Sequence, residues 1–243
     1  MEYRLSDRQI KLLEAIIREY SESSEPVGSK TVVKKYSFKV SPATIRNEMA
    51  SLLEDGYLEM MHTSSGRVPT SRAFRFFIEE LMKEDDLPVL QEVAYKQRLW
   101  PHRFEFEKML RQAVLSLADF TGYMSLAITE EGFVTYAGAG NLLDNSEFWD
   151  IEVMRSALSL VDKFDLLDKI FKDLAKSSDV SVIVGEELAV SKLDHCSLVF
   201  SPFHTQKKSG YISVLGPSRM KYPVVVPVVR HSRNLIEELS GSW

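Results

Sequence analysis

The sequence predicts an α+β protein whose N-terminal part is a winged helix-turn-helix domain. Three observations support this prediction: capped helical periodicity in the first third of the chain, a short hairpin pattern after it, and extended runs alternating with helical segments beyond. With 243 residues, 44% of them hydrophobic, the chain can bury the cores of two modest domains. We expect a first domain at residues 1–83, a connector at 84–103 and a second domain at 104–243.

Two helices are expected at the start of the first domain. Ser6 followed three residues later by Gln9 is a capping-box pattern, and the apolar residues after it recur with helical spacing. A segment with Pro and Gly then ends this helix, and Ser29 is expected to cap a short second helix up to Tyr36. Its lysines can be phosphate contacts or ordinary solvated side chains. The candidate contacts here are Ser29, Lys30 and Thr31.

The next helix is the best candidate for an element with a function. Ser41 can accept from the free amides of the first turn, and Pro42 suits the first helical position because it needs no donor there. One apolar stripe for the core follows at Ile45, Met49, Leu52 and Leu53. A recognition helix points polar groups near its N-terminal end at bases and phosphates. Such groups here are Thr44, Arg46 and Asn47.

A small hairpin, or wing, is expected after Gly56, which ends that helix. Two short extended runs, residues 57–61 and 67–69, flank a polar turn. A wing of this kind lies along a nucleic-acid backbone or in the minor groove. The candidate contacts of this part are His62, Ser64, Gly66, Arg67 and Thr70.

Charge supports a nucleic-acid partner for this region. Between Val27 and Arg75 there are eight Lys or Arg residues and four acidic ones, whereas the whole chain has a net charge of −5. A positive module on an acidic chain is the electrostatic pattern of a phosphate-binding part. We therefore predict binding to double-stranded DNA.

Three phrases in this region resemble those of the heat-inducible transcription repressors of the HrcA family. They are EPVGSKT at residues 25–31, VSPATIRNEM at 40–49 and HTSSGRVPT at 62–70. The order and the separations of the phrases match the family. Further likeness lies in the second half, in GNLL with a following EF at residues 140–148, in VGEE at 184–187 and in GPSRMKY at 216–222.

The resemblance implies a sequence-specific repressor with a GAF-like regulatory and dimerisation domain after the winged helix. It also implies an inverted-repeat operator upstream of heat-shock chaperone operons and the chaperonin as a co-repressing partner. In the family a long dimerising segment interrupts the GAF-like domain. Here only residues 124–139 separate the corresponding phrases, so we expect a short form without that insertion.

Helices and strands of the second domain can be placed from periodicity. Helical segments are expected near residues 104–120, 150–161, 166–175 and 224–239, although Pro227 makes the start of the last one uncertain. A hairpin is expected at residues 124–136, and further strands at 180–184, 197–203 and 211–215. Together they predict a mixed sheet packed by helices.

Catalysis finds little support in the sequence. There is no phosphate-binding GxxxxGK[ST] loop and no GxGxxG after a strand, and the five histidines lack metal-ligand spacing. One cysteine, Cys196, excludes an internal disulfide and any Cys-rich zinc site. We expect no enzyme, cofactor or metal. Because no apolar run approaches the roughly 20 residues that span a bilayer, we expect a cytoplasmic protein without membrane contact.

Two other function classes stay open. The winged helix could be a protein-interaction module without DNA, and the GAF-like domain could make the chain a regulator that responds to a small molecule. We also expect a homodimer, because one helix and wing contact too few base pairs to select an operator. Its surface is expected in the connector, with Tyr95, Trp100, Phe104 and Phe106, or near Phe148 and Trp149.

Overall fold

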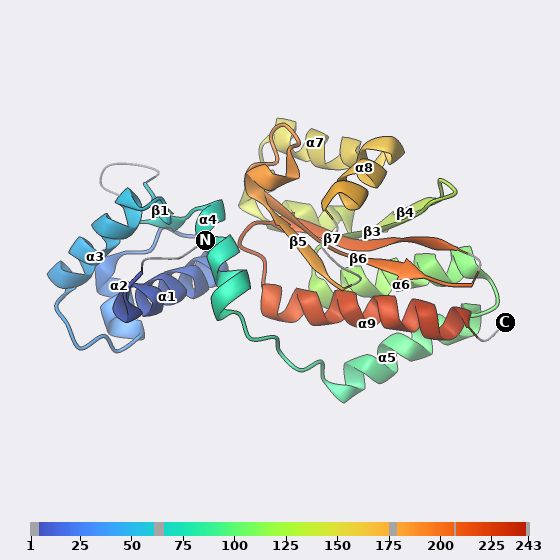
Figure 1. Cartoon of the computed structure of the whole chain (residues 1–243), viewed down its shortest axis with the longest axis horizontal. Coiled ribbons are helices and arrows are strands. Elements are labelled where there is room, and N and C mark those ends of the chain that lie inside the picture. Colours follow the sequence, from blue (N-terminus) through green and yellow to red (C-terminus); the bar gives the residue numbers. More distant parts are fainter. Residues whose placement is uncertain (1–4, 61–65, 175–178, 207, 242–243) are drawn as a thin grey trace. The chain divides into compact units, whose positions relative to one another are not determined.

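The computed structural model describes residues 5–60, 66–174, 179–206 and 208–241. The chain forms two compact units, Met1–Met82 and Lys83–Trp243 (Figure 1). The first unit contains helices and a small hairpin. Its elements are α1 (Asp7–Ser23), α2 (Ser29–Lys35), α3 (Pro42–Glu54), β1 (Leu58–Glu59), β2 (Val68–Pro69) and α4 (Ser71–Phe76), which continues as a π-helix over Phe77–Leu81.

Side-chain caps lie at the start of α1, α3 and α4. The predicted capping box is present, since Ser6 Oγ accepts from the Gln9 amide at 3.3 Å and Gln9 Oε1 accepts from the Ser6 amide at 2.9 Å. Helix α3 begins at Pro42, as predicted. The prediction for α2 was wrong by one residue, because Gly28 is its N-cap and Ser29 is already helical. Apolar side chains of each element fill the core of this unit, among them Leu12, Ile16, Val32, Ile45, Leu52 and Phe74.

The second unit is built on an antiparallel sheet with the strand order β4-β3-β7-β6-β5. Its strands are β3 (Met124–Thr129), β4 (Val134–Ala137), β5 (Ser181–Val184), β6 (Cys196–His204) and β7 (Ser209–Pro217). The prediction of a mixed sheet was wrong, since every strand pairing in the described residues is antiparallel. Only a few residues separate β3 from β4 and β6 from β7, and connections this short join antiparallel neighbours, because parallel neighbours need a crossover of a dozen or more residues.

Helices cover both faces of this sheet (Figure 1). Helices α6 (Phe106–Thr121) and α9 (Tyr222–Ser240) lie on one face, and α7 (Ile151–Val161) and α8 (Phe164–Leu174) lie on the other. The core under α7 and α8 includes Leu160, Phe171, Phe200 and Leu215. The α+β fold class is thereby confirmed.

Pro227 lies inside α9 without ending it. Because proline has no amide hydrogen, the carbonyl of Pro223 loses its usual helical donor. That carbonyl instead accepts from the amide of Asp85 at 2.9 Å. A bond from outside the helix therefore satisfies the group that proline leaves open.

The segment expected as a connector, residues 84–103, contains helix α5 (Val89–Leu99), which packs on α6 and α9 within the second unit. The Tyr95 side chain is 1% exposed, and its hydroxyl donates to the Ala113 carbonyl and accepts from Ser232 Oγ, both at 2.7 Å. Phe148 is also 1% exposed. The choice of Tyr95 and Phe148 as dimer surface was therefore wrong, because both rings belong to the core.

Candidate nucleic-acid interface

Helix α3 separates a buried face from a polar one, as its sequence predicts. Ile45, Met49 and Leu52 are buried, whereas Arg46 and Asn47 are exposed and Thr44 is half-buried. Ser41 Oγ accepts from the Thr44 amide at 3.1 Å and lies 3.0 Å from the Thr44 hydroxyl. The cap therefore fixes the N-terminal turn from which the exposed guanidinium and amide project.

The base of the wing is fixed to the turn before α2. Val27 and Arg67 exchange two backbone hydrogen bonds, with N···O distances of 2.8 and 2.9 Å. Gly66 allows this approach, because a Cβ there would lie 2.6 Å from the carbonyl carbon and oxygen of Pro26. Residues far apart in the sequence thus meet through backbone contacts.

A cavity of about 160 Å³ lies where α2, α3 and the wing meet. It brings together four predicted site residues, and Val27, Gly28 and Met49 complete its lining. The sequence did not predict these three as site residues, although Val27 and Gly28 belong to the EPVGSKT phrase at residues 25–31 that resembles the family. The predicted members are Ser29, Arg46, Gly66 and Arg67.

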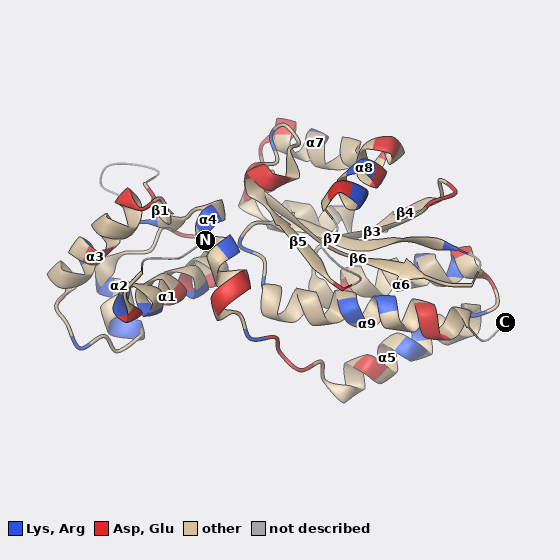
Figure 2. Cartoon of the chain, viewed as in Figure 1, with Lys and Arg blue, Asp and Glu red and all other residues tan. Residues whose placement is uncertain are grey.

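Ion pairs within the first unit neutralise some of the charges near the candidate interface. The Glu48 carboxylate on α3 pairs with Arg8 of α1, which neutralises an acid on the candidate recognition helix. Lys35 lies 2.7 Å from Glu19 and 3.1 Å from Glu22, and the hydrogen bonds to these carboxylates raise the pKa of Lys35. Lys30 and Thr31 are exposed on α2. Both basic and acidic residues lie on the helices of this unit (Figure 2).

Other predicted site residues have different positions. The Thr70 hydroxyl donates to the Gly56 carbonyl at 2.8 Å and accepts from the Ala73 amide at 3.3 Å, so it caps α4. Pro42 is exposed in the first turn of α3. His62 and Ser64 lie outside the described residues.

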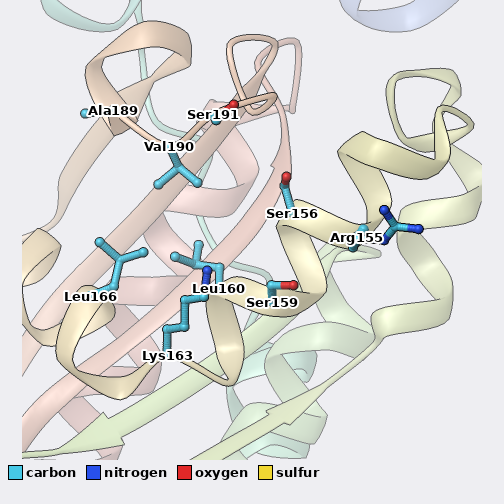
Figure 3. A pocket seen from close by; sticks show the side chains of 9 residues that line it. All are labelled: Arg155, Ser156, Ser159, Leu160, Lys163, Leu166, Ala189, Val190 and Ser191. Atoms are coloured by element: carbon cyan, nitrogen blue, oxygen red, sulfur yellow. The ribbon is translucent and has the colours of Figure 1, made fainter.

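A second cavity, of about 320 Å³, lies in the other unit between α7, the turn into α8 and residues 189–191 (Figure 3). Its floor is apolar, with Leu160 and Leu166, and Lys163 lies beside Leu160. Arg155 points away from Val190 and pairs with Glu152 at 2.8 Å. Ser156, Ser159 and Ser191 add hydroxyl groups to its lining.

Known proteins resemble this chain along most of its length. The family described as HrcA protein C terminal domain matches residues 77–226, well over half of the sequence. The chain belongs to the HrcA family. A crystal structure described as that of a hypothetical protein shares the fold, with a TM-score of 0.78 at 20% identity over 98% of this chain and 99% of that one.

Curated relatives of HrcA match along almost their full length. The heat-inducible transcription repressor HrcA of Pelotomaculum thermopropionicum is 27% identical over 93% of this chain and 94% of its own. The protein of the same name from Syntrophobacter fumaroxidans is 28% identical, with 97% of each chain covered. These relatives carry the name of a transcription repressor and not of an enzyme.

The relatives are longer than this chain. The alignment to the Pelotomaculum protein runs over 327 positions, but 93% of 243 residues is about 226, so about 100 positions have no counterpart here. This difference agrees with the expected short form. In this chain β3 and β4 are joined directly by the turn at residues 130–133.

The described residues lack the features of two other classes of site. No helix there combines the length and apolar character that a bilayer crossing requires. In the same residues, no three His, Cys, Asp or Glu side chains gather as metal ligands would.

Proposed function

We propose that this HrcA family member is a sequence-specific, DNA-binding, heat-inducible transcription repressor. The observation that carries the proposal is the convergence of α2, α3 and the wing base on one cavity lined by Arg46 and Arg67. Residues 1–83 would form the DNA-binding domain, and residues 104–243 the GAF-like regulatory and dimerisation domain.

In this proposal α3 enters the major groove of the duplex. Asn47 suits the donor and acceptor pair of adenine, and Arg46 suits a guanine edge or a phosphate. Lys30 and Thr31 on α2 reach the phosphates beside the groove, and the wing with Arg67 follows the backbone or the minor groove. The ion pair between Glu48 and Arg8 supports this arrangement, because it removes a negative charge from the face that meets the phosphates.

Membership of the family also supports a proposal for the target and the partners of the chain. We propose an inverted-repeat operator of heat-shock chaperone genes, two copies of the chain bound to it, and the chaperonin as co-repressor. The relatives named heat-inducible transcription repressor support the regulatory part of this proposal. The place of action would be the cytoplasm.

Selection of bound duplexes from a random pool tests the proposal with the full chain. We expect an inverted repeat among the recovered sequences, and an affinity for it that falls steeply as salt rises, because phosphate contacts release counterions. Recovery of no duplex, or an affinity that does not change with salt, would favour a winged helix that binds protein instead.

The cavity beside Lys163 favours one alternative, a repressor that responds to a small molecule. An apolar floor with hydroxyl groups and a cation at the rim suits a small carboxylate or phosphate with an apolar body. Thermal unfolding with a set of such compounds tests it. A stabilisation that Lys163→Ala abolishes would support the alternative, and no shift with any compound would reject it.

A further inference from the structure

Helix α5 exposes apolar side chains on the face turned away from the rest of its unit. Tyr95 and Leu99 point inward and are at most 1% exposed. The outer side chains have unusually high exposed fractions for their size. They form what we call the α5 stripe: Val89 (71%), Leu90 (84%), Val93 (47%), Trp100 (48%) and Phe104 (56%).

The stripe has the order of a packing seam. Three members of the stripe and the exposed Gln97 follow one another at intervals of three, four and three residues, which is the spacing of a seam between two paired helices: Leu90, Val93, Gln97 and Trp100. The Arg103 guanidinium lies 4.3 Å from the Trp100 ring centre and 4.2 Å from that of Phe104, so it contacts both aromatic rings of the stripe.

Charge is unequal at the two ends of the stripe. Asp85 and Asp86 are exposed just before α5, where Glu84 pairs with Arg230. Arg103 follows the helix at the opposite end. A second α5 in antiparallel orientation would set acid against base, whereas a parallel one would set like charges together.

We propose that two copies of this chain pair through the α5 stripe, with the two α5 helices antiparallel about a two-fold axis. Leu90 of one copy then packs against Trp100 of the other, and Val93 packs against Gln97. Such an arrangement is self-complementary, because each contact occurs twice. It gives the proposed repressor the two-fold symmetry that an inverted repeat requires, and in that respect it rests on the proposed function.

The stripe gathers large apolar side chains on one exposed face of α5. Apolar patches on a monomer rarely exceed a few hundred Å², and a stable interface buries roughly 800 Å² per partner. Trp100 and Phe104, about half exposed, supply large side chains of the kind that dominate interface energies. The acidic and basic ends would add a polar rim.

Sedimentation without DNA tests the interface by charge insertion. The variant Leu90→Glu/Val93→Glu leaves the inward face of α5 intact, so it should fold. We expect the unaltered chain to be dimeric at micromolar concentration and the variant to dissociate at least about tenfold more readily. Ile151→Glu is the matched control, because Ile151 is 66% exposed on α7, and it should leave the dimer unchanged.

Cross-linking tests the antiparallel orientation. Burial raises the pKa of the native Cys196 thiol to about 12, and the side chain is 0% exposed, so it gives little background. A mixture of Val93→Cys and Gln97→Cys chains should cross-link mainly as the mixed pair. Equal yields from each variant alone would overturn the antiparallel arrangement.

Other outcomes distinguish this inference from the proposed function. A chain that stays monomeric but binds duplex DNA with strong salt dependence would overturn the interface and leave the function standing. A dimer that binds no DNA would leave the interface standing and overturn the proposed function. A monomer whose melting temperature falls in Leu90→Glu/Val93→Glu would assign the stripe to contacts within one chain, and a dimer broken only by Ile151→Glu would move the interface to α7.

Discussion

Asn47 is exposed on α3 beside Arg46, and its amide offers both a donor and an acceptor. We predict that Asn47→Ala relaxes sequence preference, with a loss of about 1–3 kcal/mol per base contact and no change in the free energy of unfolding. Competition between the operator and duplexes with single base changes measures this. Asn234→Ala, an exposed position on α9, is the control. Unchanged specificity in a folded Asn47→Ala protein would remove Asn47 from base recognition.

Gly66 is required by the close approach of two backbone segments. A Cβ at this residue would overlap Pro26, and we predict that Gly66→Ala destabilises the first unit by about 1–3 kcal/mol and weakens DNA binding. Denaturant unfolding and duplex titration measure the two effects. At Gly140 a Cβ would meet no atom within 4 Å, so Gly140→Ala should be neutral. Equal effects of the two substitutions would contradict the steric argument.

At the scale of the element, two substitutions of Ser41 separate its capping of α3 from the effect of a charge at that end of the helix. Ser41→Ala should cost about 1 kcal/mol of stability, because the Thr44 amide loses its acceptor. Ser41→Asp retains a cap acceptor and should retain stability, but its carboxylate would repel phosphates and lower DNA affinity. Denaturation and salt titration of both variants check this. If Ser41→Asp bound DNA as well as the unaltered chain, the N-terminal end of α3 would not face phosphate.

The wing can be tested through the salt dependence of binding. Arg67→Ala should weaken binding to all sequences about equally and lower the salt slope by about one, because one phosphate contact is lost. Lys35→Ala serves as the control, since Lys35 already pairs with Glu19 and Glu22 and should contribute little to the slope. A normal slope for Arg67→Ala would place Arg67 outside the interface.

At the scale of the whole molecule, the proposed dimer predicts how affinity depends on the operator. A duplex with both half-sites should bind at least about tenfold more tightly than a duplex with one, because the second contact becomes intramolecular. Leu90→Glu/Val93→Glu should reduce this ratio and leave half-site binding unchanged. Fluorescence anisotropy with both duplexes measures the ratio. A ratio near one for the unaltered chain would contradict two-fold binding.

The sequence by itself determined the local features of this protein. The cap at Ser6, the start of α3 at Pro42, the polar face with Arg46 and Asn47, and most strand positions follow from spacing within a few residues. Capping, helical periodicity and strand alternation depend on neighbours in the chain, so they can be recognised without a fold.

The tertiary structure alone decided how distant segments meet. It placed Gly66 against Pro26, paired Glu48 with Arg8, and made every strand pairing of the described sheet antiparallel. It also buried Tyr95 in a segment that the charged residues around Lys83 mark as a connector. Strand direction and burial depend on contacts between residues far apart in the chain, and no local pattern records which of several possible partners lowers the free energy most.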